Sequence, residues 1–178
     1  MQRIVVVGTT GSGKTTIAAE LAARLGCPHI ELDALHWAPG WQEVPLETFR
    51  TRLAGAIAAD RWVADGNYSE VCDLLWRQAD TIIWLDYPFL TIFRQLLRRT
   101  LRRIATREVL WGTNRESLRT LFSRDSIILW MLKTYHRRRR QYPILFEQPE
   151  HAHLHVARLH SPAQTRAWLM QLADQHHG

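Results

Sequence analysis

Residues 4–25 read IVVVGTTGSGKTTIAAELAARL, and this stretch decides the fold. Four apolar residues lead directly into residues 8–15, which match the pattern G-x-x-x-x-G-K-[ST]. The residues that follow place Ile17, Leu21 and Leu25 four positions apart, which is typical of one face of a helix. A strand, a glycine-rich loop and a helix in this order predict a phosphate-binding loop.

The composition of the loop suits the polyphosphate of a nucleotide. Glycines let the backbone wrap closely around phosphates, and the helix start adds its positive dipole end. We expect Lys14 to contact the β- and γ-phosphates, Thr15 to bind Mg²⁺ and Thr16 to touch the α-phosphate. The predicted ligands are ATP or GTP with Mg²⁺, and the predicted binding residues are Gly8, Thr9, Gly11, Ser12, Gly13, Lys14, Thr15 and Thr16.

Short apolar runs rich in β-branched residues recur along the chain, with helical patterns between them. The runs lie at 3–7, 29–32, 61–64, 81–85 and 153–159. The predicted helices include 14–25, a segment opened by Pro45, and a short segment from Ser69, as N-cap, through Trp76. This alternation predicts an α/β fold with a doubly wound parallel sheet.

Residues 89–142 carry no strand pattern and predict a helical insertion between the fourth and fifth strands. An apolar stripe and a neighbouring arginine row mark its first helix: Leu90, Phe93, Leu97, Leu101 and Ile104 beside Arg94, Arg98 and Arg102. A second helix is expected from near Ser126 to the four arginines at 137–140. We expect one domain over 1–178 that contains this insertion.

The positive charge of the chain is concentrated in this insertion. The net charge is +6, but residues 94–140 hold 14 basic against 3 acidic residues, a net charge of +11. The rest of the chain holds 9 basic and 14 acidic residues, a net charge of −5. Such a block implies an anionic partner. For residues 137–140, three interpretations stay open: a solvated helix face, part of a phosphate-binding lid, or a nucleic-acid patch.

The composition excludes several other classes of protein. With 46% hydrophobic and 22% charged residues, the chain is neither disordered nor a coiled coil. Two cysteines are too few for a disulfide scaffold. No stretch approaches the ~18 apolar residues of a membrane span, so a cytoplasmic protein without a membrane partner is expected.

Carboxylates stand where three of the predicted strands end. Asp33, Asp65 and Asp86 each follow an apolar run. Ligands of open α/β sheets bind at the carboxyl ends of the strands, and a phosphate-binding loop needs an acidic partner for Mg²⁺ there. Asp65 and Asp86 are the two candidates for that partner.

Four further segments carry a resemblance to a known group: LDALHW at 32–37, DGNY at 65–68, NRES at 114–117 and SRDS at 123–126. Together with the phosphate-binding loop, they resemble the P-loop superfamily of nucleoside monophosphate kinases and shikimate kinases. Within it, the chain looks most like small bacterial adenylate-kinase-related proteins of the "DNA topology modulation" type. The resemblance covers nearly the whole chain.

The resemblance implies a five-stranded parallel sheet of order 2-3-1-4-5, with helices on both faces and the basic insertion as a lid. It implies that Asp65 holds Mg²⁺ through water, with Asp86 as second choice, and that the loop at 160–162 lies near the base. The catalytic residues that it implies are Lys14, Asp33, Arg98, Arg115 and Arg124, the arginines neutralising the transferring phosphoryl group.

Two departures from adenylate kinases bear on the acceptor. Asn67-Tyr68-Ser69 replaces the Phe-Pro-Arg that follows Asp-Gly in those enzymes, and Ala34, Leu35 and His36 replace a segment that carries an arginine. Both changes remove groups that bind an acceptor phosphate. We therefore predict ATP/Mg-dependent phosphoryl transfer to a small molecule, either a hydroxyl compound with Asp33 as general base or a nucleotide. The alternative is a regulatory ATP-binding protein that acts on nucleic acid through its arginine-rich segment.

Overall fold

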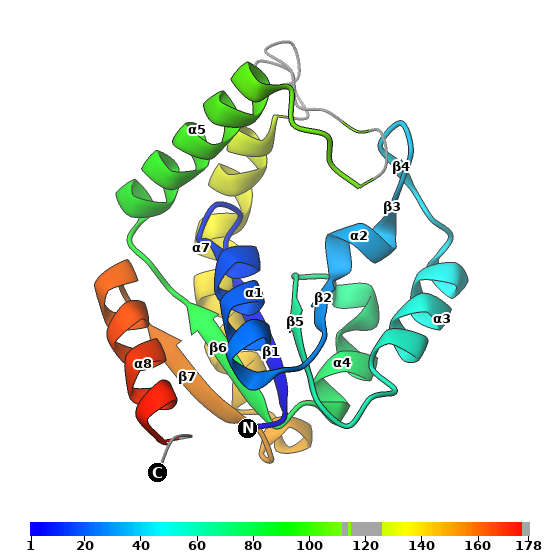
Figure 1. The fold of residues 1–178 in the computed structure, drawn as a ribbon, viewed down its shortest axis with the longest axis vertical. Helices are drawn as coiled ribbons and strands as arrows, with labels where there is room; N and C mark the ends of the chain where they lie inside the picture. Colours follow the sequence, from blue (N-terminus) through cyan, green and yellow to red (C-terminus); the bar gives the residue numbers. More distant parts are fainter. Residues whose placement is uncertain (112–113, 115–125, 176–178) are drawn as a thin grey trace.

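The computed structural model describes residues 1–111, 114 and 126–175. Its centre is a five-stranded parallel sheet (Figure 1). The strands are β1 (Arg3–Gly8), β2 (His29–Glu31), β5 (Trp62–Asp65), β6 (Thr81–Leu85) and β7 (His155–Leu159). Their order across the sheet is β2-β5-β1-β6-β7, so the predicted order 2-3-1-4-5 is confirmed.

Helices cover both faces of this sheet, and α7 (Ile127–Phe146) contributes to both. One face packs against α1 (Lys14–Leu25), α5 (Phe89–Thr106) and α8 (Pro162–Gln175). The other face packs against α3 (Leu46–Ala56) and α4 (Cys72–Gln78). Because both faces are covered, the central strands are buried, β6 along its whole length and β1 in every residue after Arg3.

The predicted helices are present, with local corrections. Helix α1 ends at Gly26, whose φ of +60° suits glycine. The Ser126 hydroxyl caps α7 by accepting from the N–H of Ile128 at 3.2 Å. Helix α7 continues past residue 140 to Phe146 because its last turns bury aromatic rings against the sheet. Ser69 does not cap α4: it begins a 3₁₀ turn, η1 (Ser69–Val71), and makes no capping hydrogen bond.

Helix α5 is rotated relative to the predicted apolar stripe. Leu90 and Leu101 are 55% and 48% exposed, whereas Ile92, Leu96 and Thr100 are buried. The buried side faces the glycine-rich loop, because a Cβ added to Gly11 would lie 2.7 Å from Leu96 Cβ. The face of α5 that is buried therefore packs on the loop as well as on the core.

The segment after β2 holds elements that the sequence did not predict. Residues expected as the strand end and a loop instead form α2 (Leu32–His36) and a hairpin of β3 (Trp37–Ala38) and β4 (Gln42–Glu43). A second short 3₁₀ turn, η2 (Pro149–His151), precedes β7. The hairpin reverses at Gly40 and Trp41, which both have positive φ angles.

The end of the insertion beyond α5 contacts this hairpin. Leu110 and Asn114 form an isolated antiparallel bridge. Asn114 Oδ1 accepts from the N–H of Trp41 at 2.8 Å, and its Nδ2 donates to the carbonyl of Ala38 at 3.1 Å. The Trp111 indole donates to Glu31 Oε2 at 3.0 Å. In the described part of the chain, every helix falls short of the length and hydropathy that crossing a lipid bilayer requires.

Candidate functional site

The glycine-rich loop connects β1 to α1 at the carboxyl edge of the sheet (Figure 1). Gly11 and Gly13 have φ angles of +89° and +92°, which side chains other than glycine rarely adopt. The N–H of Ser12 donates to the carbonyl of Thr9 at 3.0 Å and closes the turn. The loop is thus preformed, and α5 supports it through Gly11.

The start of α1 is open to solvent. Gly13, Thr15 and Thr16 are exposed, and the first N–H group to bond back to the loop is that of Ile17, to the carbonyl of Gly13 at 3.1 Å. The N–H groups ahead of Ile17 have no partner within the helix. These N–H groups form the positive end of the helix dipole, which favours negative charge. This arrangement fits a phosphate group.

Lys14 carries a charge that no carboxylate neutralises among the residues described. Its ammonium lies 3.5 Å from the carbonyl of Thr9, and it forms no salt bridge there. Burial, followed by the positive charge of Arg138, lowers its pKa from 10.5 to about 8, against the opposing effect of Asp65 and Asp33. An incoming polyphosphate would supply the missing negative charge.

Asp65 joins the loop to the edge strand. Its Oδ2 accepts from the Thr15 hydroxyl at 2.7 Å, and its Oδ1 lies 2.8 Å from His29 Nε2. His29 is 18% exposed and projects from β2 on the same side as Asp65. Because Asp65 accepts at Oδ1, the imidazole donates through Nε2. A hydroxyl and a carboxylate this close are suitable oxygen ligands for Mg²⁺, directly or through water.

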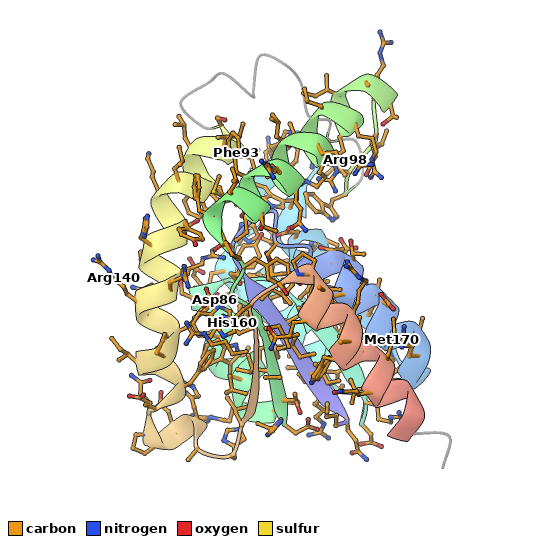
Figure 2. The ribbon with its side chains drawn as sticks, turned by 90° about the vertical axis from the view of Figure 1, so that its left-hand side faces the viewer. Asp86, Phe93, Arg98, Arg140, His160 and Met170 are labelled. Carbon is orange, nitrogen blue, oxygen red and sulfur yellow. The ribbon has the colours of Figure 1, made fainter. Side chains whose placement is uncertain are left out.

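Asp86 has different partners, although it also follows a strand. Its side chain is 1% exposed and lies 2.7 Å from Arg139 Nε and 2.6 Å from the Arg158 guanidinium. His160 approaches it to 3.7 Å, and Figure 2 shows the two residues next to each other. Arg158 also stacks on Trp84 at 4.2 Å. Asp86 is therefore the centre of an ion-pair cluster rather than a neighbour of Thr15.

Asp33 lies on α2, where its Oδ1 accepts from the Tyr68 hydroxyl at 2.5 Å. The Tyr68 ring packs edge-on against Phe49 and tilts against His36, with centroids 5.2 and 4.5 Å apart. Burial, with the charge of Asp33, raises the pKa of Tyr68 far above its usual range. Tyr68 therefore remains a hydrogen-bond donor to Asp33.

A network at the first glycine of the loop was not anticipated. Asn67 donates to the Gly8 carbonyl at 2.7 Å and accepts from the Gly8 N–H at 3.2 Å and from the Tyr142 hydroxyl at 2.8 Å. Arg138 of α7 donates to the same carbonyl at 3.1 Å. The four-residue spacing of Arg138 and Tyr142 is the sequence feature that could have indicated this network, because it places both residues on one helix face.

Of the three predicted catalytic arginines, Arg98 alone belongs to the described residues. Arg98 is exposed on α5 (Figure 2), as are Arg94 and Arg102. Its neighbour Arg99 is the α5 arginine that acts on the pKa of Lys14. The other two predicted catalytic arginines, Arg115 and Arg124, lie outside the described residues.

Comparisons with known proteins identify the fold. No family model and no curated protein sequence matches the chain. Its structure is similar to a shikimate kinase from Bacteroides thetaiotaomicron, with a TM-score of 0.56, 15% identity, and 99% of each chain covered. A shikimate kinase from Acinetobacter baumannii in complex with shikimate gives a TM-score of 0.56 and 16% identity over 97% of this chain and 90% of that one. A gluconokinase from Sinorhizobium meliloti gives a TM-score of 0.52 and 18% identity over 99% of this chain and 95% of that one. The chain therefore has a shikimate-kinase-like P-loop fold.

Proposed function

We propose that this protein is a kinase that transfers the γ-phosphoryl group of ATP, with Mg²⁺, to a hydroxyl group of a small molecule. One observation carries the proposal most directly. Lys14, whose ammonium has no salt bridge among the described residues, lies beside the exposed start of α1. The similarity in fold to shikimate kinases and a gluconokinase supports the same class of reaction.

Each residue near the loop has a role in this proposal. The N–H groups at the start of α1 and Lys14 bind the phosphates, and Thr15 with Asp65 holds Mg²⁺. Bound Mg²⁺ supplies charge neutralisation at the β- and γ-phosphate oxygens. Asp33 accepts the proton of the acceptor hydroxyl, and the acceptor oxygen bonds to the γ-phosphorus. The bond from that phosphorus to the β,γ-bridging oxygen breaks, and ADP leaves with the electron pair.

The acceptor side favours a hydroxyl compound. Asp33 holds one carboxylate oxygen for Tyr68, which leaves the other to accept a proton. The partly exposed rings of His36 and Tyr68 suit the carbon skeleton of a small acceptor. Within the superfamily, we propose that the chain is related to small bacterial adenylate-kinase-related proteins of the "DNA topology modulation" type. The segments at 32–37 and 65–68 support this relationship.

The test compares the two lysines of the chain. Lys14→Ala is expected to abolish ATP binding measured by calorimetry, whereas Lys133→Ala, at an exposed position of α7, is expected to bind ATP normally. Unchanged ATP binding in Lys14→Ala contradicts the site. A screen of hydroxylated metabolites, nucleosides and nucleoside monophosphates with γ-labelled ATP then identifies the acceptor.

The nucleic-acid alternative predicts a different outcome of the same assays. DNA would stimulate ATP hydrolysis while no small molecule accepts phosphate. DNA binding through the arginine-rich segment would also weaken steeply between about 50 and 200 mM salt. Transfer to a small molecule without an effect of DNA supports the kinase.

A further inference from the structure

A cavity of about 560 Å³ lies along β2, the strand at one edge of the sheet. Besides β2, its walls come from α2, the end of α3 and Trp111 of the insertion. Lys14, Thr15, Asp33 and Asp65 do not belong to the described residues that line it. The cavity is therefore separate from the nucleotide site and from the acceptor side, and its volume accommodates a small organic molecule.

Apolar groups form most of the walls of this cavity. Helix α2 contributes the side chains of Ala34 and Leu35, and α3 contributes that of Ala56. The indole of Trp111 adds an aromatic ring. Because apolar walls with a few polar groups are typical of sites for small molecules, the skeleton of a ligand here is expected to be apolar.

Trp111 is held beside the cavity by contacts of its side chain and its backbone. Its indole N–H donates to Glu31 Oε2 at 3.0 Å, and its carbonyl accepts from Asn114 Nδ2 at 3.4 Å. Its φ angle of +37° is one that bulky residues rarely adopt. Such backbone strain persists only where surrounding contacts maintain it, and it is typical of functional sites. The position of the indole ring is thus imposed on Trp111 by these contacts.

Glu31 brings a carboxylate without a paired cation to the same cavity. Its side chain is partly buried, and in the part of the chain that the structure describes it forms no salt bridge. His29, the other ionisable residue of the described lining, bonds instead to Asp65 at 2.8 Å. A partly buried carboxylate is stabilised by a cation that replaces its lost hydration. A ligand that carries an ammonium group would supply this cation.

We propose that the cavity along β2 binds an organic ammonium compound with an apolar skeleton. The ammonium donates to Glu31 and lies against the ring of Trp111, because aromatic faces attract cations. The skeleton packs on Leu35 and Ala56. A β-strand of another protein is a poorer fit, since β2 offers only three residues along which such a strand could pair.

Strand β2 connects the cavity to the proposed Mg²⁺ site. Glu31 pairs in register with Asp65, and His29 lines the cavity while it bonds to Asp65. An ammonium bound to Glu31 cancels a negative charge next to Asp65 and so weakens the attraction for Mg²⁺. We expect the ligand to raise the Mg²⁺ concentration needed for ATP turnover by about 3-fold. This effect, unlike binding itself, rests on the proposed function.

The test titrates benzylamine, a ring that carries an ammonium group, into the nitrogen-15-labelled protein without nucleotide. It follows the indole N–H resonance of Trp111, which is assigned by its loss in Trp111→Phe. We expect a Kd of about 1 mM for benzylamine, and binding about 10-fold weaker for benzyl alcohol, which lacks the charge.

Two variants of glutamate test the role of the charge. Glu31→Gln keeps an acceptor for Trp111 and is expected to weaken benzylamine binding by about 10-fold without an effect on benzyl alcohol. Glu47→Gln, at an exposed position of α3 outside the described lining, is the matched control and should bind both compounds like the unmodified protein. Glu31→Gln should also abolish the effect of benzylamine on the Mg²⁺ requirement.

Ala34→Phe fills the cavity from an exposed position of α2. It is expected to abolish benzylamine binding while the spectrum remains that of a folded protein. A Trp111 resonance that does not move at about 50 mM benzylamine overturns the proposal. Unchanged affinity for benzylamine in Glu31→Gln or in Ala34→Phe also overturns it. Failure of the unmodified protein to bind ATP would overturn the proposed function instead, because the benzylamine titration contains no nucleotide.

Discussion

The Thr15 hydroxyl donates a 2.7 Å hydrogen bond to Asp65 Oδ2, although 50 residues separate the two in the chain. Parallel pairing of β1 with β5 brings the end of β5 next to the loop that leads into α1. His29 takes the other carboxylate oxygen at 2.8 Å. The carboxylate is therefore held at both oxygens, with Thr15 exposed to an incoming ligand. This relationship separates Asp65 from Asp86 in what each is expected to do.

Asp65→Asn is expected to raise the Mg²⁺ concentration needed for nucleotide turnover by about 10-fold or more, because the amide is a poorer partner for Mg²⁺ or its water. The measurement is a Mg²⁺ titration of ATP hydrolysis or transfer at saturating ATP. Melting should change little, since Asp65 has no salt bridge with an arginine or lysine in the described part of the chain. An unchanged Mg²⁺ requirement would show that another group holds the metal.

Asp86→Asn is expected to lower the stability of the fold without changing the Mg²⁺ requirement. It removes the negative charge that pairs with Arg139 and Arg158, whose side chains are partly exposed. We expect a loss of about 2 kcal/mol in the free energy of unfolding, less than for a fully buried pair. Urea denaturation measures this loss, and the Mg²⁺ requirement should stay the same. If Asp86→Asn raised the Mg²⁺ requirement and Asp65→Asn lowered only the stability, Asp86 rather than Asp65 would be the partner of Mg²⁺.

His29→Ala is expected to raise the Mg²⁺ requirement by about 10-fold while kcat at saturating Mg²⁺ changes little, because His29 orients Asp65 without touching a substrate. His29→Gln is the matched variant, since its amide can donate to Asp65 from a similar distance along the side chain. It should recover most of the loss. If His29→Ala titrates with Mg²⁺ like the unmodified protein, Asp65 does not depend on His29.

Nucleotide binding is expected to take up a proton through Lys14. Burial and Arg138 lower the pKa of Lys14 to about 8, so at pH 8 about half of the ammonium groups are neutral in the free protein. An anionic polyphosphate beside Lys14 raises its pKa again, so binding at pH 8 should absorb about half a proton per site. Uptake should vanish near pH 6, where Lys14 is already protonated.

Calorimetric titration with ATP in buffers of different ionisation enthalpy measures this uptake. Lys14→Arg is the control, because its guanidinium stays protonated at every pH used. It keeps a positive charge and should show no uptake from this site. A binding enthalpy of the unmodified protein that is independent of the buffer at pH 8 would contradict the lowered pKa.

Local patterns predicted the parts of this fold that depend on neighbours in sequence. The loop at 8–15 and the helix over 14–25 follow from residue spacing alone, and the structure has that helix from Lys14 to Leu25. The five apolar runs became the five strands. The three central ones, β1, β5 and β6, are buried, and continuous apolar runs are typical of such strands. The order of the strands came from the resemblance.

Contacts between distant segments determine the orientation of α5 and the different partners of Asp65 and Asp86, which local sequence patterns do not predict. Arg98 and Arg99 are adjacent in the chain but about 100° apart around α5, so the orientation of the helix decides which of the two lies near the loop. The packing of Leu96 on Gly11 sets that orientation. Likewise, Asp65 and Asp86 look alike as strand ends in the sequence. Their partners distinguish them: Thr15 and His29 contact Asp65, whereas Arg139 and Arg158 pair with Asp86.

Gly11→Ala tests whether α5 supports the loop. An added Cβ would lie 2.7 Å from Leu96 Cβ and 3.2 Å from the carbonyl oxygen of Ile92, so the backbone of α5 must move, and the φ of +89° adds strain. We expect a loss of about 3 kcal/mol in the free energy of unfolding, together with weaker ATP binding. Gly26→Ala separates packing from strain, because Gly26 also has a positive φ but nothing lies within 4 Å of its added Cβ. It should cost only about 1 kcal/mol and leave ATP binding intact. Equal losses in the two variants would mean that the contact between α5 and the loop contributes nothing to the stability of the site.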